Sequence, residues 1–208
     1  VPSYKLSDTY TVSASILLSQ DLAGVGDTTL NNMSLKLSKK ATPMGINLKW
    51  SPSLTAYLPT NEKARIDKRY YGGVATGIVL VTDSPVGGLD LTYGLSLKKD
   101  FHEFETDNLN RENVELSMAN TLAISKSFGD KLSLSLTGVY QSGQTYRGTQ
   151  KNLFILDESL SYQLNKAVSV AVGHTNEGNA FRYDGITSNI EVYDEETSTI
   201  YMSLSVKN

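Results

Sequence analysis

The sequence predicts an all-β fold, a transmembrane up-and-down antiparallel β-barrel of about ten strands. The first observation is that large apolar residues alternate with small hydroxyl residues, as in Leu132-Ser133-Leu134-Ser135-Leu136-Thr137. A period of two is typical of strands with one apolar and one polar face. The second observation is that this pattern recurs from one end of the chain to the other. The third is that short turns alternate with longer polar loops between the repeats.

Ten segments carry the alternation, and each is near or above the roughly 9 to 11 residues with which a tilted strand crosses hydrocarbon. We expect these strands over residues 4–20, 29–40, 45–58, 71–82, 89–103, 113–127, 131–145, 150–164, 167–177 and 196–207. A count of twelve would require a further hairpin within residues 181–193.

The connections differ in length in a regular way. Four tight turns contain Gly, Pro, Asn or Asp at residues 42–45, 83–88, 128–130 and 165–166. The longer, charged connections include residues 59–70, 105–113 and 178–197. Short turns at one rim and long loops at the other, with both termini at the short-turn rim, are typical of outer-membrane barrels.

Composition narrows the class of protein further. The 208 residues keep one texture without a linker, so we expect a single domain over residues 1–208. The net charge of −3 and the scattered cations give no basic surface for nucleic acid. Apolar runs such as Ile78-Val79-Leu80-Val81 are far below the roughly 18 residues of a spanning helix. Because the chain starts at Val1, we expect a mature form from which a signal peptide has been removed.

The residues of the polar face distinguish a membrane barrel from a soluble one. A soluble barrel also alternates, with its apolar face inward, but its outer face would be rich in Lys, Glu and Arg. Here the polar face consists mostly of Ser and Thr, which suit a narrow lumen, so the apolar face is expected to contact lipid. Aromatic residues near strand ends predict contacts at the membrane interface. These are Tyr57, Tyr71, Phe101, Phe128, Tyr140, Phe154 and Tyr162.

Two polar residues fall on the predicted lipid face. Asn120 and Glu158 lie well inside their strands, where a charged group near the membrane midplane costs on the order of a few kcal/mol. For Glu158, either a bulge shifts the register at Asp157-Glu158 or a neighbouring side chain shields the carboxylate.

Charged residues on the inward parity are the best clue to function. They predict a polar column that either pairs fully and plugs the barrel or leaves a water path and sets an ion preference. The lumen residues are Lys36, Lys49 and Lys98, with Asp90, Glu115 and Asp157 as partners. A barrel of about ten strands would hold only a narrow pore.

The histidines offer little support for catalysis. Asp100 and His102 lie two residues apart on the polar face, and this Asp-x-His pair resembles half of the catalytic arrangement of omptin-type outer-membrane proteases. That resemblance covers three residues, and the second acidic pair that it implies is missing. A structural alternative is that Asp100 and His102 are rim residues in an ion-pair network with Lys98 and Lys99. His174-Thr175-Asn176 departs from the pattern of a lipid A deacylase, and we expect His174 at the interface.

The long loops carry opposed charges. Residues 61–70 are basic, whereas residues 103–112 and 191–196 are acidic. Cations at this rim would suit lipopolysaccharide phosphates or a surface partner; they are Lys63, Arg65, Lys68, Arg69 and Arg182. A third alternative is that the loops fold over the mouth and close it.

As a whole the chain resembles the porin-like class of outer-membrane β-barrels, without a specific family. That resemblance implies the outer membrane of a Gram-negative bacterium, although the last strand, residues 200–208, lacks the terminal aromatic residue common in the class. We expect a monomeric, narrow or largely plugged pore for ions and small solutes. The alternative is a barrel that anchors partner-binding loops, and a membrane hydrolase comes third. We expect no enzyme activity, catalytic residue, cofactor or metal.

Overall fold

The computed structural model describes residues 2–20, 28–45, 47–82, 88–182 and 185–206. A 12-stranded antiparallel sheet has the order β1-β2-β5-β7-β8-β9-β10-β11-β12-β13-β14, with β6 paired to β7, and β3 pairs with β4. The strands are β1 (Ser3–Lys5), β2 (Tyr10–Ser15), β3 (Leu18–Gln20), β4 (Thr28–Leu30), β5 (Ser34–Lys39), β6 (Thr42–Pro43), β7 (Leu48–Tyr57), β8 (Tyr70–Thr82), β9 (Asp90–His102), β10 (Val114–Phe128), β11 (Leu132–Thr145), β12 (Gln150–Gln163), β13 (Val168–Asn179) and β14 (Thr199–Val206). A short helix, α1 (Glu62–Asp67), lies between β7 and β8.

The all-β, up-and-down antiparallel arrangement that the sequence predicts is confirmed, because consecutive strands pair along the sheet. The expected segment 4–20 is wrong as one strand. Leu6 and Ser7 donate their backbone N–H groups to the carbonyl of Tyr10, and the Ser7 hydroxyl accepts from the N–H groups of Thr9 and Tyr10. This turn folds β1 back onto β2 as a hairpin.

Twelve strands arise in the main sheet, but not by the route that the sequence suggested. Ten strands carry the barrel pattern, and the short β1 and β6 complete the twelve. In the described part of residues 181–193, a single bridge joins Phe181 to Ser188, so the further hairpin through which a count of twelve would have arisen is not formed there. The predicted turn at 83–88 lies outside the described residues except for Gly88, which has a positive φ of 77°.

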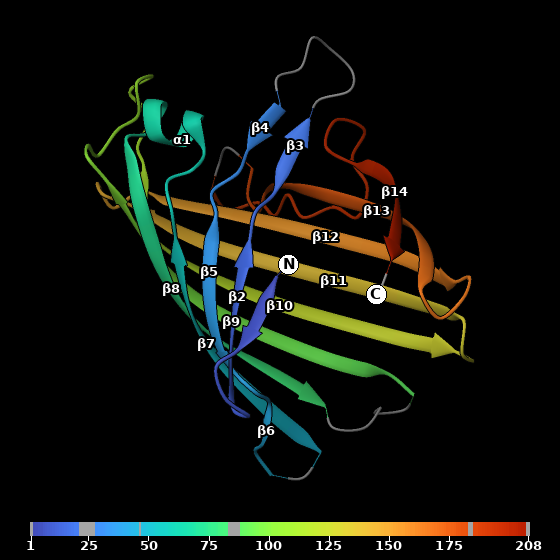
Figure 1. Ribbon diagram of the computed structural model, residues 1–208. Helices are drawn as coiled ribbons and strands as arrows, with labels where there is room; N and C mark the ends of the chain where they lie inside the picture. Colours follow the sequence, from blue (N-terminus) through green and yellow to red (C-terminus); the bar gives the residue numbers. More distant parts are fainter. Residues whose placement is uncertain (1, 21–27, 46, 83–87, 183–184, 207–208) are drawn as a thin grey trace.

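The sheet curls so that β1 and β2 lie in front of β9 to β11 in Figure 1. It is not closed, since the described residues show no pairing between β14 and the β1–β2 end. Every neighbouring pair along the path is antiparallel, so β14 runs opposite to β2 and in the same direction as β1. An antiparallel partner for the free edge of β14 is therefore β2 and not β1.

The apolar residues lie mostly at the surface rather than in a central core. Leu134 and Leu136 are 46% and 44% exposed, while Ser133 and Ser135 on the other face are half-buried. Among the described residues, the buried hydrophobic ones are Tyr70, Ala75, Phe154 and Ala180. A water-soluble domain would bury its leucines, so this distribution suits a surrounding apolar solvent.

No helix in the described residues combines the length and hydropathy needed to cross a membrane.

The two polar residues of the apolar face, Asn120 and Glu158, have different surroundings. The Tyr93 hydroxyl lies 2.7 Å from Oδ1 of Asn120 and donates to it. The β11–β12 and β12–β13 registers run without a shift through Asp157 and Glu158, so the bulge considered for Glu158 is absent. Glu158 instead lies directly opposite His174 on β13.

Candidate functional site

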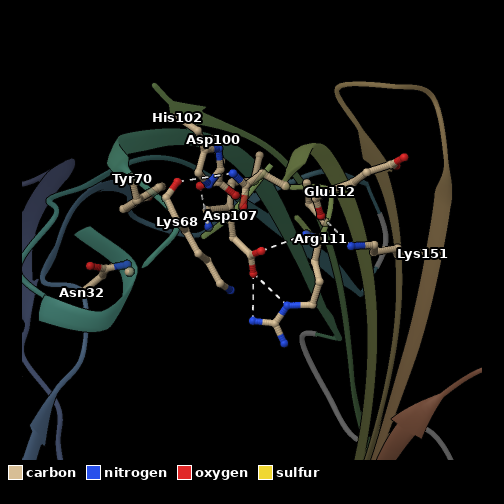
Figure 2. Close-up of a pocket in the computed structure, with 13 residues that line it drawn as sticks. Asn32, Lys68, Tyr70, Asp100, His102, Asp107, Arg111, Glu112 and Lys151 are labelled. Atoms are coloured by element: carbon tan, nitrogen blue, oxygen red, sulfur yellow. Dashed lines mark hydrogen bonds and ion pairs between the residues drawn. The ribbon is translucent and has the colours of Figure 1, made fainter. Parts of the chain in front are cut away.

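Three loops converge at the outer rim, the end of the barrel that bears the long connections. Residues 58–69, 103–113 and 146–149 meet there above the ends of β8, β9 and β11. The first two of these loops, together with residues of β8, β9, β10 and β12, line a cavity of about 390 Å³, the rim cavity. Figure 2 shows Asp107 and Arg111 pointing toward each other and Lys68 extending beside them.

Asp107 organises the 103–113 loop. Its Oδ1 accepts from the backbone N–H groups of Leu109 and Arg111 at 2.9 and 2.8 Å, and its Oδ2 accepts from Nε of Arg111 at 2.8 Å. Asn110 adopts a positive φ of 60° inside this turn, a conformation that Asn tolerates better than most residues. The backbone and side-chain donors of Arg111 hold the pKa of the Asp107 carboxyl below its ordinary value.

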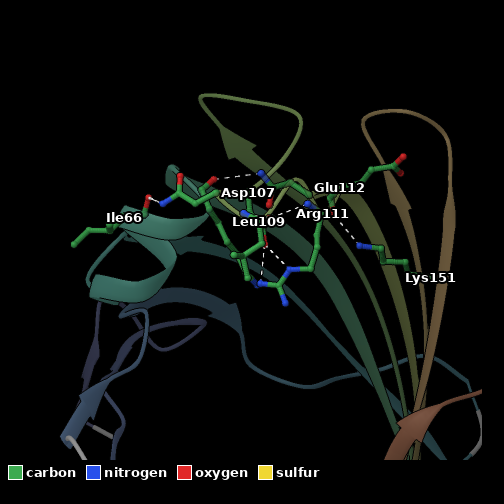
Figure 3. A network of polar contacts seen from close by, with 9 residues as sticks. Ile66, Asp107, Leu109, Arg111, Glu112 and Lys151 are labelled. Atoms are coloured by element: carbon green, nitrogen blue, oxygen red, sulfur yellow. Dashed lines mark hydrogen bonds and ion pairs between the residues drawn. The ribbon is translucent and has the colours of Figure 1, made fainter.

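Asparagine side chains attach this loop to its neighbours. Asn108 donates its backbone N–H to the carbonyl of Asp67 and its Nδ2 to the carbonyl of Ile66, at the end of α1. Asn113 is buried and donates Nδ2 to the carbonyls of Lys68 and Phe104. Helix α1 and the 103–113 loop therefore form one connected rim structure, part of which Figure 3 shows.

A second set of contacts joins the loop to β11 and β12. Lys151 on β12 donates Nζ to the backbone carbonyl of Glu112 at 2.6 Å, as Figure 3 shows. The Thr145 hydroxyl donates to Oε2 of Glu112 at 2.7 Å, and hydrogen bonds from Thr149 and Thr145 lower the pKa of that carboxyl. Arg147 pairs with Glu105 at 3.1 Å. The loop is thus held on both sides of the rim cavity.

Below the loop, Lys98 lies between a carboxylate and aromatic rings. Its Nζ is 2.8 Å from Oδ1 of Asp100, 4.5 Å from the centroid of the Tyr57 ring and 6.0 Å from that of Tyr70. A Cβ at Gly73 would come within 2.6 Å of Asp100 Oδ1 and 2.9 Å of the Tyr70 hydroxyl. Glycine at this position of β8 therefore makes room for the cluster.

His102 packs among aromatic rings rather than against a carboxylate. Its ring centroid is 5.3 Å from that of Tyr70 and 5.8 Å from that of Tyr146, the latter edge to face. The Tyr146 hydroxyl accepts from the His102 backbone N–H and donates to the carbonyl of Asp100. In the described residues no hydrogen bond joins the Asp100 carboxylate to the His102 ring. Lys98 forms the ion pair with Asp100 that the structural alternative predicts. Lys99 instead pairs with Glu115.

A second cavity, of about 350 Å³, lies further down the polar face of β5 to β10, and we call it the lumen cavity. Lys36 and Tyr57 line it together with Ser and Thr side chains and with apolar residues such as Val79 and Ala119. Since Tyr57 also contacts Lys98 of the rim cavity, the two polar cavities adjoin at that pair.

The predicted lumen charges do not form one continuous column. Asp157 accepts from the Tyr201 hydroxyl. Lys49 is half-buried opposite Val81, and Asp90 is exposed opposite Ser125 at the short-turn end. The placement of Glu115 in the lumen is wrong. A register shift between Val114 and Leu116 lets Glu115 reach Lys99, which shares the apolar face with Leu97.

Two of the predicted interface aromatics lie elsewhere. Tyr57 shares the polar face with Thr55 and Ser53, so it points into the barrel. Phe154 is only 4% exposed because its ring packs over Gly178. Tyr140 is half-buried, and the remaining four are exposed: Tyr71, Phe101, Phe128 and Tyr162.

The predicted loop cations have different surroundings. Lys63 and Arg65 lie on α1, with Asn61 capping the helix by accepting from the N–H of Ala64 at 2.8 Å. Lys68 lines the rim cavity, and Arg69, with a positive φ of 52°, precedes β8. Arg182 reaches Glu191 at 3.5 Å within its own loop. Arg182 therefore lies on a different loop from the other four cations.

Sequence reasoning missed Asp107, Asn113, Tyr146 and Tyr201. Three of them lie in or beside loops, where no periodicity indicates which way a side chain points. An available signal was Asp107-Asn108-Leu109-Asn110, since Asp and Asn favour turns in which their side chains accept from nearby backbone N–H groups.

Comparisons with known proteins support the fold. No protein-family model and no curated protein matches the chain. Among solved structures, the chain is similar to OmpT (in-vitro folded), an outer membrane protein of Vibrio cholerae, with a TM-score of 0.53 and 9% sequence identity. The match covers 97% of this chain and 61% of that one, so the chain spans less than two thirds of its length. The chain has the fold of the outer-membrane β-barrel class.

Proposed function

We propose that this chain is a monomeric barrel in the outer membrane of a Gram-negative bacterium and acts as a narrow pore for ions and small solutes. The observation that carries the proposal is the pair of adjoining polar cavities along the inner face, about 350 and 390 Å³ in volume. They meet where Lys98 contacts Tyr57. The outward leucines and the likeness to an outer membrane protein support the membrane setting.

The 103–113 loop is the proposed constriction. Figure 2 shows the side chains of Asp107, Arg111 and Lys68 projecting into the space between the strands at the mouth. Because Asp107 fixes Arg111 at 2.8 Å, the loop would narrow the path rather than move freely within it. The cluster around Asp100 and His102 has a structural role in this proposal and no catalytic one.

Conduction requires a closed wall. An open edge exposes backbone N–H and C=O groups, which cannot find partners in hydrocarbon. In the proposed membrane state β14 pairs with β2, since those two strands run in opposite directions. The three residue pairs that hold β1 on β2 would be released.

Electrical recording from the purified protein in planar lipid bilayers tests the proposal. We expect steady ohmic current steps, and larger steps when Arg111 is replaced by Ala, because the guanidinium lies in the proposed mouth. Lys126→Gln is the matched control, since Lys126 lies at the far end of β10 opposite Leu134 on the apolar face. Electrical silence of folded, inserted protein would contradict the pore.

Exposed apolar residues in the 185–193 segment favour a second function, in which the barrel anchors a partner-binding loop. Ile186 is 84% exposed, and Val192 and Tyr193 are 60% and 62% exposed. Exposed apolar patches often mark interaction sites. Vesicles bearing the protein would then bind a partner surface through this segment, and Ile186→Ser with Val192→Ser would abolish that binding. Silence in bilayers together with this loop-dependent binding would favour the anchor over the pore.

A further inference from the structure

The lumen cavity holds one lysine without a counter-charge. Lys36 lines the cavity from β5, between Ser13 on β2 and Thr55 on β7 in the strand register. Within the described part of the chain, Lys36 has no ion pair and no aromatic ring beneath its ammonium group. An uncompensated ammonium in a confined polar space attracts anions.

Two carboxylates of the inner face already have partners. Asp100 is 2.8 Å from Lys98 at the rim, and Asp157 accepts from Tyr201 on the far strands β12 to β14. Glu115 lies with Lys99 on the apolar face. The positive charge of Lys36 is therefore not cancelled by these three acids.

Hydroxyl groups line the same cavity as the lysine. In the described residues, six Ser and Thr side chains line the cavity and make no hydrogen bond with the protein, which leaves their O–H donors available. They are Ser34, Ser53, Thr55, Thr92, Ser96 and Thr121. Gly77 and Gly94 lie in the same wall, where a Cβ would approach Ser53 Oγ to 3.4 Å and Thr121 Cβ to 3.5 Å. The missing side chains keep the space between the hydroxyls open.

We propose that the lumen cavity is a binding subsite for a small oxyanion, a phosphate or a carboxylate, with Lys36 as its cation and the surrounding hydroxyls as its hydrogen-bond donors. An oxyanion suits this set of groups because it accepts several hydrogen bonds at once. The rim offers a route to the subsite, since Lys68 and Lys151 line the rim cavity without a carboxylate partner among the described residues. The inference rests on the proposed lumen and gives the pore an anion preference.

Binding of inorganic phosphate to the purified protein in detergent micelles, followed by ³¹P NMR, tests the subsite without requiring conduction. We expect saturable binding that is roughly tenfold weaker in Lys36→Gln, the factor that corresponds to loss of one charge-assisted hydrogen bond. Lys36→Arg would keep most of the affinity, and Lys126→Gln, with the same change of net charge outside the cavity, would leave it unaltered. Matching urea-unfolding midpoints would show that the variants are folded.

Two results of the phosphate titration would overturn the subsite. One is absence of phosphate binding by the folded wild-type protein, and the other is equal binding by wild type and Lys36→Gln. Thr55→Val tests the donors, since it keeps the shape beside Lys36 but removes an O–H; we expect it to weaken phosphate binding more than chloride binding.

Reversal potentials in a KCl gradient separate the subsite from the pore. Anion preference in the wild type that is lost in Lys36→Gln would support both. Current with the same ion preference in wild type and Lys36→Gln would overturn the subsite and leave the pore standing. Lys36-dependent phosphate binding by a protein that carries no current would overturn the pore and leave the subsite standing.

Discussion

The hydroxyl of Tyr201 on β14 lies 2.9 Å from Oδ2 and 3.2 Å from Oδ1 of Asp157 on β12, so the two side chains meet across the intervening strand β13. Gly173 lies opposite Tyr201 in the strand register, and a Cβ there would overlap the Tyr201 ring. The tyrosine therefore lies flat over the glycine and ties the last strand of the sheet to its second neighbour. This contact gives β14 a fixed position although one of its edges is unpaired.

Gly173→Ala is expected to destabilise the protein by about 1–3 kcal/mol, the usual cost of overpacking a filled site. The new methyl group would push the Tyr201 ring away and break its bond to Asp157. Gly138→Ala is the matched control, because a Cβ there would meet only Leu156 at an ordinary 3.7 Å. Urea unfolding in detergent micelles measures both, and equal losses of stability would contradict the role of the Tyr201 contact.

Asp107 predicts a rim that loosens in acid. Its pKa is lowered in the folded loop, so its stabilising effect is complete above the ordinary Asp pKa of about 4 and is lost as the pH falls through the lower, folded pKa. The amide resonances of Leu109 and Arg111 should therefore shift together below about pH 4. In Asp107→Asn the amides should be less protected from hydrogen exchange even at pH 7.

Asp67→Asn is the control for this prediction, since Asp67 meets the 103–113 loop through its backbone carbonyl. In Asp67→Asn, the chemical shifts and hydrogen-exchange rates of the Leu109 and Arg111 amides should match those of the wild type. Unchanged protection of Leu109 and Arg111 in Asp107→Asn would show that the loop is held by its other contacts, those of Asn108 and Asn113.

The long strands could be predicted from sequence because alternation over a dozen residues determines both the strand and its faces. In β11, for example, the run from Leu132 places Leu134 and Leu136 on one face and Ser133 on the other, as observed. At the N-terminus the same alternation led to the wrong prediction of one strand over residues 4–20. Tyr4, Leu6, Tyr10 and Val12 share one parity on both sides of Asp8, so alternation with a single polar interruption does not reveal the hairpin.

The candidate site could be predicted only in part, for physical reasons that differ from residue to residue. Lys36 and Lys98 line the cavities as strand parity indicated. Glu115 could not be placed, since a bulge reverses parity locally and leaves no mark in the hydropathy pattern. The arrangement of Asp107 and Asn113 depends on contacts between three loops, which no local pattern specifies.

The Tyr93–Asn120 contact predicts a specific coupling on the apolar face. Tyr93→Phe removes the hydroxyl that lies 2.7 Å from Asn120 and leaves the amide without its partner, at a cost of about 1–2 kcal/mol. Asn120→Leu should cost little, because it removes the polar group from the hydrocarbon side. The double variant should be no less stable than Asn120→Leu alone. Unfolding free energies of the four proteins give the coupling, and additive losses would contradict it.

Closure of the barrel predicts that an engineered disulfide can form between β2 and β14, two strands that are not paired in the structure. The chain has no cysteine, so Ser13→Cys on β2 and Ser203→Cys on β14 would provide the sole thiols, both on small residues of the polar parity. If β14 pairs antiparallel with β2 in lipid, mild oxidation should cross-link them in vesicles. Val170→Cys on β13 is the control. Ser203→Cys should not cross-link with it, because Ser203 and Val170 lie on opposite faces of the sheet. Cross-linking is also expected when β1 is deleted, since β1 occupies the β2 edge. If oxidation of folded, inserted protein gives no cross-link from Ser13→Cys to Ser203→Cys and none to the neighbouring Ser205→Cys, pairing of β14 with β2 at these positions is contradicted.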